Sequence, residues 1–485
     1  MEETTMTSEL LSLAPLLLFW FFSISSSVFD ALIKESRRFT FGYSLVGMAM
    51  VVIAALCVPI FGHSGTAFDN MIRVGGTTVY FDVLFALGGI LTVVTARPYL
   101  QKMNYELDEF YTLVMYALGG MLLMAHSNHM VVVFIGIEIM SICFYVLAGY
   151  IRTSSLSVEA ALKYFLLGAF ASGFLVYGMA LIYGATGSME YGPVAAVVSQ
   201  GSEFPTLLLV GIGLIIVGLS FKVAAFPFHS WVPDVYQGAP SVVTGFMSTA
   251  GKAAAFAAFL PLMMVLMPGP GMERVQTLLA VIAAASMLYG NISALRQNNV
   301  KRMLAYSSIA HAGYLMIGIV TGTDFGESAM MFYLAAYLFM QLGAFVIIGI
   351  LENREGGFVS MEDYAGLAKH QPTLAALMAV FLFSLTGIPP LAGFFAKYYL
   401  FYAAVEAGFT WLTIVGVASS IISVYFYLGL VVQMYFREPA EGFVAPQVKT
   451  GMAGITLLVT TVAVFLLGLY PVMVQSVTDA LAMLK

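Results

Sequence analysis

The stretch LSFKVAAFPFHSWVPDVYQGAPSVVTGFMSTAGK, residues 219–252, decides the fold. It places Lys222 in an apolar run, breaks that run at Pro227, and puts Lys252 deep in the next apolar run. A lysine near the middle of a bilayer costs about 2.5 to 3.5 kcal/mol on insertion scales, so it marks a candidate functional position. A proline-broken helix at that depth must be buried in protein or line a polar cavity. The stretch therefore predicts ion or proton movement through a membrane.

The composition supports a membrane-embedded chain. Of its 485 residues, 60% are hydrophobic and 9% are charged, whereas a globular domain carries about 25% charged residues. The formal charge of −6 is spread over short loops and indicates no nucleic-acid partner. The acidic opening MEETTMTSE predicts no cleaved secretory signal. With only Cys57 and Cys143, the usual four-ligand zinc and iron–sulfur sites are excluded, so we expect no metal or cofactor in this chain.

Apolar runs predict the transmembrane helices. A helix needs about 20 such residues to cross the hydrocarbon layer, and about fourteen runs qualify. They lie near residues 10–30, 42–62, 79–97, 110–126, 129–150, 159–184, 206–228, 240–266, 275–294, 303–321, 328–351, 373–404, 410–435 and 452–478. The loops between them are short, so we expect no soluble domain.

The basic residues divide unequally between the two sets of loops. Thirteen follow odd-numbered runs: Lys34, Arg37, Arg38, Arg97, Lys102, Arg152, Arg296, Lys301, Arg302, Arg354, Lys369, Arg437 and Lys449. Three lie on the other side: Arg73, Arg274 and Lys485. Because cytoplasmic loops carry an excess of Lys and Arg, this bias predicts that both termini lie outside the cytoplasm.

The remaining four lysines fall within the spans. They are Lys163, Lys222, Lys252 and Lys397. At about 3 kcal/mol each, they would together cost roughly 12 kcal/mol if they faced lipid, so they must face protein or water. Lys163 lies near the start of its span, and the alternative there is a side chain that extends to the interface.

One carboxylate and two histidines complete the candidate set. Glu138 lies mid-span in VVVFIGIEIMSICFYV, and a charge partnership with Lys222 is the interpretation we favour over a neutral acid bonded to a backbone carbonyl. His311, in YSSIAHAGY, suits a proton relay because histidine titrates near physiological pH. His229 follows the break at Pro227 and either relays protons or caps the helix. We expect the other four histidines to be solvated: His63, His126, His129 and His370.

The sequence also carries a hint of internal duplication. One span is interrupted at Pro227 and another at Pro389 and Pro390, within LTGIPPLAGFFAKYY. The string LGAF occurs at residues 167–170 and again at 342–345. Both pairs are five spans apart, and this odd offset would make the two units inverted in the membrane, as in many transporters.

These motifs resemble the antiporter-like subunits of respiratory complex I, and the likeness extends over nearly the whole chain. The most specific strings are FKVAAFPFHSWVPDVYQGAPSVVTGFMSTAGKAAAF, LKYFLLGAFASGFLVYGMALIYGATG, NVKRMLAYSSIAHAGY and LTGIPPLAGFFAKYY. Within the family, VYQGAP and a lysine at 397 favour the branch that includes mitochondrial subunit 2. A sister branch carries glutamate at the latter position.

The resemblance implies an all-α polytopic fold with two inverted five-helix repeats, each with a proline-broken helix, joined by a buried polar axis. The implied divisions are residues 1–109 (helices 1–3), 110–270 (helices 4–8), 271–436 (helices 9–13) and 437–485 (helix 14). Carried over, Glu138 and Lys222 are the charge pair and Lys163 is a modulating lysine. Lys252 is the central lysine, His311 the relay and Lys397 the far terminal residue.

The implied function is proton translocation driven by redox chemistry elsewhere in an NADH:quinone oxidoreductase. NADH, FMN, iron–sulfur clusters and quinone would then belong to partner subunits, with neighbouring antiporter-like subunits and lipid as direct contacts. We expect a location in the inner membrane of a bacterium. The alternative function is that of a cation/proton antiporter subunit of an Mrp-type transporter. A third interpretation, a passive scaffold, assigns the buried charges to helix packing.

Overall fold

The computed structural model describes residues 2–32, 37–200, 206–267, 273–353, 357–439 and 450–483. Lys34, Arg354, Lys449, Lys485 and the expected boundary at 270/271 lie outside these ranges. Within the described residues the fold is helical except for one short hairpin. Eleven of the described helices are long and apolar enough to cross a membrane, or twelve if the bent pair at the C-terminal end counts as one span.

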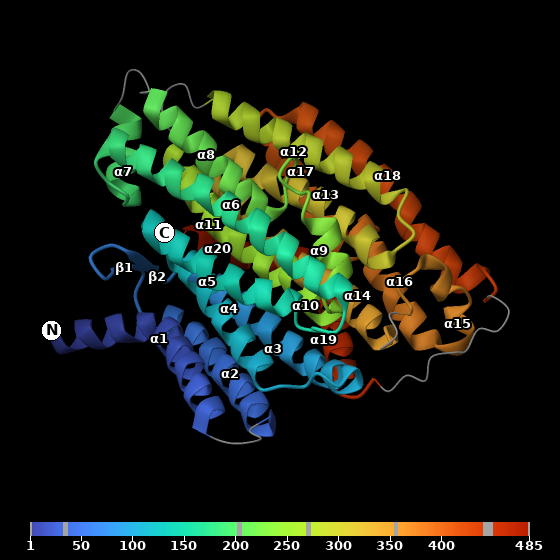
Figure 1. Ribbon diagram of the computed structural model, residues 1–485. Helices are drawn as coiled ribbons and strands as arrows, with labels where there is room; N and C mark the ends of the chain where they lie inside the picture. Colours follow the sequence, from blue (N-terminus) through green and yellow to red (C-terminus); the bar gives the residue numbers. More distant parts are fainter. Residues whose placement is uncertain are drawn as a thin grey trace.

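The N-terminal part consists of three long helices and the hairpin. The elements are α1 (Glu2–Leu32), α2 (Arg37–Phe61), β1 (Gly65–Ala67), β2 (Ile72–Val74) and α3 (Thr77–Met103). The antiparallel strands pair Gly65 with Val74. A bridge from Ile72 to Ser127 ties the hairpin to the C-terminal end of α4 (Glu109–His126). The sequence patterns did not predict this hairpin. In Figure 1, α1 and α2 stand at one edge of the molecule.

The next group of helices carries most of the candidate residues. It comprises α4 (Glu109–His126), α5 (Met130–Ala148), α6 (Ser155–Thr186), α7 (Tyr191–Gln200), α8 (Thr206–Val223), α9 (Val232–Gly238), α10 (Ser241–Phe246), the π-helix η1 (Met247–Gly251) and α11 (Lys252–Leu266). Helices α4 and α5 approach closely at Gly120 and Gly136, where a Cβ on Gly120 would lie 2.6 Å from the Gly136 carbonyl oxygen. Small residues allow such backbone contact between membrane helices.

A second group follows a similar plan. It comprises α12 (Glu273–Ala294), α13 (Val300–Thr321), α14 (Asp324–Leu351), the 3₁₀-helix η2 (Met361–Tyr364), α15 (Leu367–His370), α16 (Pro372–Thr386), α17 (Ala392–Glu406) and α18 (Thr410–Phe436). Helices α12 and α13 also meet at glycine, since a Cβ on Gly313 would lie 2.6 Å from the Ala283 carbonyl oxygen. Helices α13 and α14 are the interior of the molecule, with 94% and 89% of their apolar windows buried.

Two helices are interrupted at corresponding motifs. Helix α8 ends at Val223, before Ala224 with φ +68°, and α16 ends at Thr386, before Gly387 with φ +93°. A proline follows three residues later in each case, Pro227 and Pro390. The predicted interruptions are therefore present, but the helix in the predicted span 206–228 ends earlier than expected, because Ala224 has a left-handed φ that ends α8.

The C-terminal pair, α19 (Ala453–Leu469) and α20 (Pro471–Met483), falls on the last predicted apolar run. The run 452–478 contains a break that hydropathy did not indicate, since the two helices meet at an 89° bend. Pro471 begins α20, and the residue before a proline is disfavoured in helical conformation. Tyr470 accordingly leaves the helix with φ −121° and ψ 48°.

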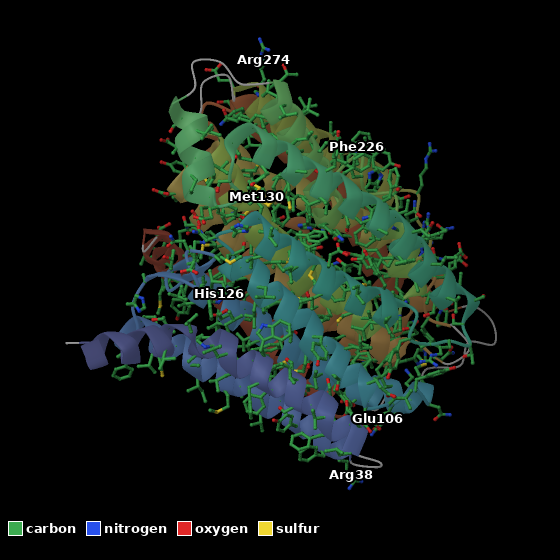
Figure 2. The ribbon with its side chains drawn as sticks, turned by 60° about the vertical axis from the view of Figure 1, so that its left-hand side comes forward. Arg38, Glu106, His126, Met130, Phe226 and Arg274 are labelled. Carbon is green, nitrogen blue, oxygen red and sulfur yellow. The ribbon has the colours of Figure 1, made fainter. Side chains whose placement is uncertain are left out.

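Loops at alternate helix ends gather on two opposite faces. On one face Tyr105 bonds Thr153, the Lys102 ammonium donates to the Ile350 carbonyl, and Asn299 bridges Ser360. On the other, Gln276 donates to the Val320 carbonyl and His129 bridges Glu190. Figure 2 shows Arg38 and Glu106 near one end and Arg274 at the other. We call the first of these the basic-loop face, because it carries the excess of lysine and arginine.

Candidate functional site: a buried polar axis

One face of α13 organises the site. Ser308, His311 and Tyr314 follow one another at intervals of three residues, which places them on the same side of a helix. All three are at most 2% exposed. Each contacts a different ionisable or phenolic group brought in by another helix, so α13 connects elements that are far apart in the sequence.

Lys252 is held by the first of these residues. Its ammonium donates to the Ser308 carbonyl oxygen and to Ser308 Oγ, both at 2.5 Å. The side chain is 2% exposed and its Nζ lies 5.5 Å from the centre of the Tyr337 ring. Lys252 directly follows the π-helix Met247–Gly251, and π-turns within α-helices occur frequently at functional sites.

His311 is flanked by two phenols. Its Nδ1 lies 2.6 Å from the Tyr333 hydroxyl of α14, and its Nε2 lies 3.3 Å from the Tyr427 hydroxyl of α18. The Tyr427 hydroxyl also bonds Ser307 Oγ. With a hydroxyl on each ring nitrogen, the imidazole can accept a proton on one side and release one on the other.

Lys397 ends the series on α17. Its ammonium donates to the Thr386 carbonyl oxygen at 2.8 Å, at the interruption between α16 and α17, and lies 4.8 Å from the centre of the Tyr314 ring. The broken helix thus supplies a free carbonyl that holds the lysine. A groove of about 350 Å³, lined by Lys397, Tyr398 and Ser420 among others, lies beside it.

Glu138 and Lys222, the predicted charge pair, are not in direct contact. No ion pair joins them among the described residues; instead the Lys222 ammonium donates to Ser141 Oγ at 2.9 Å. Glu138 lies three residues before Ser141 on α5, and its carboxylate accepts from Ser172 Oγ of α6 at 2.5 Å. The two charges are therefore near neighbours, each satisfied by a serine.

Between Lys222 and Lys252 the contacts are apolar. Phe144, three residues after Ser141, packs so closely on Gly251 that a Cβ there would lie 2.6 Å from its ring. Phe144 also meets Phe246 edge-on. In the described part of the chain no hydrogen bond connects the Lys222 group with the Lys252 group, so the axis is polar at both ends of this segment and aromatic within it.

Lys163 lies in an ionic cluster near the basic-loop face. Its ammonium pairs with Glu159 at 2.7 Å and Asp234 at 2.6 Å. The other Asp234 oxygen binds Arg302 of α13 at 2.6 Å. The side chain of Lys163 is 41% exposed, which agrees with a position close to the helix end.

His229 lies apart from these contacts. Its ring stacks on Phe226 and lies against Tyr289 at centroid distances of 5.4 and 4.5 Å. It is 7% exposed, and its Nδ1 has no hydrogen-bond partner among the described residues. The structure thus places His229 at the break in the helix, packed between aromatic rings, and among the described residues no hydrogen bond joins it to the lysines.

His126, which we expected to be solvated, is buried. It is 1% exposed; its Nε2 lies 2.8 Å from Asp82 Oδ1 and its Nδ1 2.8 Å from the Arg73 carbonyl oxygen. That prediction was wrong because tertiary partners, not local sequence, cover the side chain. Lys301, counted with the loops, lies in the first turn of α13 and is 2% exposed. By contrast His370 is exposed, and partial burial lowers the pKa of His129 despite the nearby Glu190.

Several residues of the axis were not identified from the sequence. They are Ser141, Ser172, Ser308, Tyr314, Tyr333 and Tyr427. The usable signal was helical spacing: Ser141 is three residues from Glu138, and Ser308 and Tyr314 are each three from His311. Among the described residues no group of three or more His, Cys, Asp or Glu side chains could hold a metal ion.

Comparison with known proteins places the chain in a family. The profile of the transmembrane domain shared by NADH:quinone oxidoreductase and Mrp antiporters matches residues 127–423. The chain belongs to this family. It is 43% identical to NADH-quinone oxidoreductase subunit N of Trichlorobacter lovleyi over 91% of this chain and 90% of that protein. It is 42% identical to subunit N 1 of Chloroherpeton thalassium over 98% and 99%.

Solved structures share the fold. A chain of respiratory complex I from Thermus thermophilus with bound aureothin superposes with a TM-score of 0.82 and 35% identity, over 95% of this chain and 98% of that one. A chain of the Mrp complex from Dietzia sp. DQ12-45-1b gives a TM-score of 0.84 over 98% and 97%. At 22% identity the latter shows only that the fold is common to both assemblies.

Proposed function

We propose that this chain is a proton-translocating membrane-arm subunit of an NADH:quinone oxidoreductase. The observation that carries this is the face of α13, where Ser308 holds Lys252, His311 lies between two phenols, and Tyr314 lies under Lys397. On this face the titratable ring of His311 lies between the residue that holds Lys252 and the residue that contacts Lys397. The curated relatives named above, at 42–43% identity over most of the chain, support the same assignment.

The proposed topology has fourteen spans, with two inverted repeats formed by α4–α11 and α12–α18. Three features support the repeats: the glycine contacts of α4–α5 and α12–α13, the packing of α6 and α14 against both halves of a broken helix, and the matching interruptions after Ala224 and before Pro390. The apolar helices account for twelve of these spans when the bent C-terminal pair counts as one. Helix α4 and the broken pair α16–α17 are the other two. The excess of lysine and arginine assigns the basic-loop face to the cytoplasm.

The mechanism follows from how the charges are held. A change in the distance between Glu138 and Lys222 alters the field on the Lys222 ammonium, since the opposite charge favours its protonated form. When the field favours deprotonation, Lys222 releases a proton toward Lys252. The proton then passes through His311, whose two hydrogen-bonded nitrogens permit uptake and release, and goes on to Lys397. Lys163, tied to Asp234, would modulate the first step, and His229 remains a possible relay.

The partners would be other membrane-arm subunits, especially neighbouring antiporter-like chains, and lipid. NADH, FMN, iron–sulfur clusters and quinone would be bound by other subunits. The exposed face of α18 is suited to such contacts, since it presents Ile414, Ile421 and Tyr425, each more than 60% exposed. The assembly would lie in a bacterial inner membrane.

The test is alanine replacement of Lys252 in the intact complex, reconstituted in vesicles. We expect quinone-coupled acidification to be lost while subunit composition is retained. Lys369→Ala is the matched control, because Lys369 is an exposed lysine whose ion pair with Glu438 lies in solvent. Full proton translocation by the Lys252→Ala complex would overturn the proposal and leave the passive scaffold as the better interpretation.

A cation/proton antiporter subunit of the Mrp type is the second candidate, because the same fold occurs in that assembly. Purification of the tagged chain in mild detergent separates the two. Recovery with iron–sulfur subunits supports the oxidoreductase. Recovery without iron, together with sodium-dependent proton exchange, would support the antiporter.

A further inference from the structure

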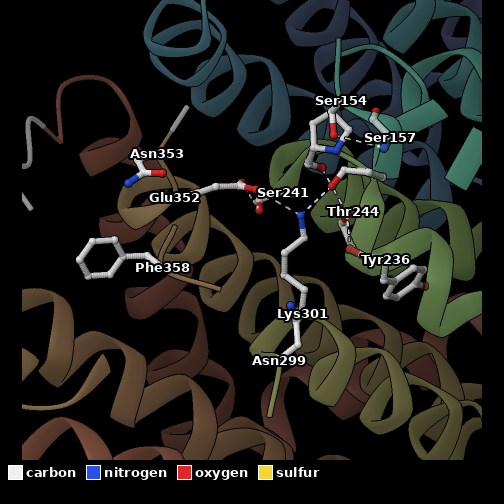
Figure 3. A network of polar contacts seen from close by, with 12 residues as sticks. Ser154, Ser157, Tyr236, Ser241, Thr244, Asn299, Lys301, Glu352, Asn353 and Phe358 are labelled. Carbon is white, nitrogen blue, oxygen red and sulfur yellow. Dashed lines mark hydrogen bonds and ion pairs between the residues drawn. The ribbon is translucent and has the colours of Figure 1, made fainter. Parts of the chain in front are cut away.

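The strongest unassigned feature is a buried ion pair below the polar axis, on the side of the basic-loop face. Lys301 Nζ lies 3.4 Å from Glu352 Oε1, with the two side chains 2% and 12% exposed. The ammonium also donates to the Ala239 carbonyl oxygen at 2.7 Å. Figure 3 shows this pair with Ser241, whose hydroxyl donates to Glu352 Oε2 at 2.6 Å. Buried pairs are weak evidence of stabilisation, because desolvation offsets much of their attraction, so another role needs consideration.

A cavity at the basic-loop face lies next to this pair and is separated from it by Tyr99. It measures about 700 Å³ and lies between α3, α14 and the start of α19. Its lining includes the exposed Gln101 and Thr450 as well as the buried Tyr99. The Tyr99 hydroxyl donates to Glu352 Oε2 at 3.0 Å. A single phenol thus separates the cavity from a buried carboxylate.

Other charged and titratable groups also surround Glu352. Lys102 of α3 lines the cavity and donates to the Ile350 carbonyl oxygen at 2.8 Å. Tyr364 of η2 lies close enough to interact electrostatically with Glu352. Glu352 therefore has two cations and two phenols around it: Lys102 and Tyr99 on α3, Lys301 on α13, and Tyr364 on η2.

A stripe of hydroxyls runs from Glu352 toward the central lysine. Ser241, Thr244, Ser248 and Lys252 recur at intervals of three and four along α10, η1 and α11, which is the spacing of one helix face. The Thr244 and Ser248 hydroxyls donate to carbonyls of nearby backbone, and their oxygens can still accept. On α13, Lys301 precedes Ser308 by seven residues, about 10 Å along the axis of a helix.

We propose that the cavity, Tyr99 and Glu352 form the port through which protons from the basic-loop face reach Lys252, with Lys301 as the positioning residue. Tyr99 gives its hydroxyl proton to Glu352 and takes one from the cavity side, so the phenol is regenerated. Glu352 then gives its proton to Ser241 Oγ as Ser241 releases its own to the next hydroxyl of the stripe. Each hydroxyl gains and loses one proton, and the last proton goes to the neutral amine of Lys252. Glu352 returns to the carboxylate, while Lys301 stays with the Ala239 carbonyl. This inference rests on the proposed function.

The test uses the whole complex in inverted vesicles, with Tyr99→Phe and Glu352→Gln. Both variants keep the side-chain shape, and we expect each to lower the rate of proton translocation by about a hundredfold or more. Glu352→Gln should also remove the dependence of that rate on pH at the basic-loop face, whereas a purely structural defect would lower it equally at every pH. If Glu352→Gln does not assemble, Tyr99→Phe decides.

Thiol labelling gives an independent readout. In a Cys57→Ser background, Thr450→Cys should react with a membrane-impermeant anionic thiol reagent from the basic-loop face and lose translocation, while Lys369→Cys should react without loss. Unchanged translocation in Tyr99→Phe and in labelled Thr450→Cys would overturn the port. If Lys252→Ala still abolishes translocation, the proposed function stands without it; if Lys252→Ala translocates fully, both fail.

Discussion

Replacing His126 with alanine should strongly destabilise the chain, although His126 adjoins a short turn. The substitution removes the partner of the Asp82 carboxylate and of the Arg73 carbonyl, both within 2.8 Å of the ring, where Asp82 and His126 are each 1% exposed. Breaking a buried charged pair by deleting one member costs about 3 to 5 kcal/mol. Asp82→Asn keeps the shape and a hydrogen bond, so we expect a smaller loss of about 1 to 2 kcal/mol.

Cys143 provides the assay, because it is a free and buried thiol on α5, which packs against α4. In the assembled complex, with Cys57 replaced by serine, its reaction rate with a thiol dye reports opening of this region. A loss of about 4 kcal/mol would raise that rate roughly a thousandfold. The control is His370→Ala, since an exposed side chain should change stability by about 0.5 kcal/mol or less. A His126→Ala rate within about threefold of the parent would refute the reasoning.

The remaining predictions concern single contacts. Tyr427→Phe removes the hydroxyl at His311 Nε2, and we expect proton translocation in vesicles to fall about a hundredfold with normal assembly. Gly393→Ala should prevent accumulation of the folded chain, because the new Cβ would lie 1.8 Å from the Ser384 carbonyl oxygen. The amount of chain in membranes is measured by immunoblot. Gly429→Ala is the control and should be neutral, because nothing lies within 4 Å of its new Cβ. Lys163→Met should leave the thermal unfolding temperature of the complex unchanged, since the lysine is 41% exposed and exposed ion pairs contribute little to stability.

The apolar runs and broken helices were predictable because they depend on local sequence. A run of about 20 apolar residues specifies a span wherever it folds, and Pro227 and Pro390 prevent a helix from continuing through their positions because proline lacks a backbone N–H. The bend at Tyr470 had the same kind of signal in Pro471, but hydropathy alone continues through it. The hairpin Gly65–Val74 lacks such a signal, because its strands are three residues long.

The polar partners were harder to predict, because they come from distant segments. His126 is covered by Asp82, 44 residues earlier, and Lys301 by Glu352, 51 residues later. Charge counting places both near loops and cannot detect such partners. For Glu138 and Lys222 the prediction of a direct charge pair was incomplete, since each binds a serine on another helix: Lys222 binds Ser141 of α5, and Glu138 binds Ser172 of α6.

The nature of these partners separates two kinds of charge in the molecule. Lys222, Lys252 and Lys397 are each held by a hydroxyl or a carbonyl. A neutral hydroxyl or carbonyl accepts a hydrogen bond from the ammonium. When the lysine loses its proton, no unpaired carboxylate is left beside it. A carboxylate in direct contact would hold that proton more firmly, because opposite charges attract strongly in a dry interior.

The carboxylate partners of the other lysines lie toward the basic-loop face instead. Lys163 binds Asp234, Lys301 binds Glu352, and Lys369 binds Glu438. Of these pairs Lys301–Glu352 is the most buried, and it is the one next to the cavity. If the interior lysines carry mobile protons, they need neutral partners; if Glu352 takes protons from the cavity, it needs a fixed cation nearby to keep it charged between transfers. The contacts described meet both conditions. Ser308→Asp would give Lys252 a carboxylate partner, so it should trap the proton on Lys252 and stop translocation without disturbing assembly.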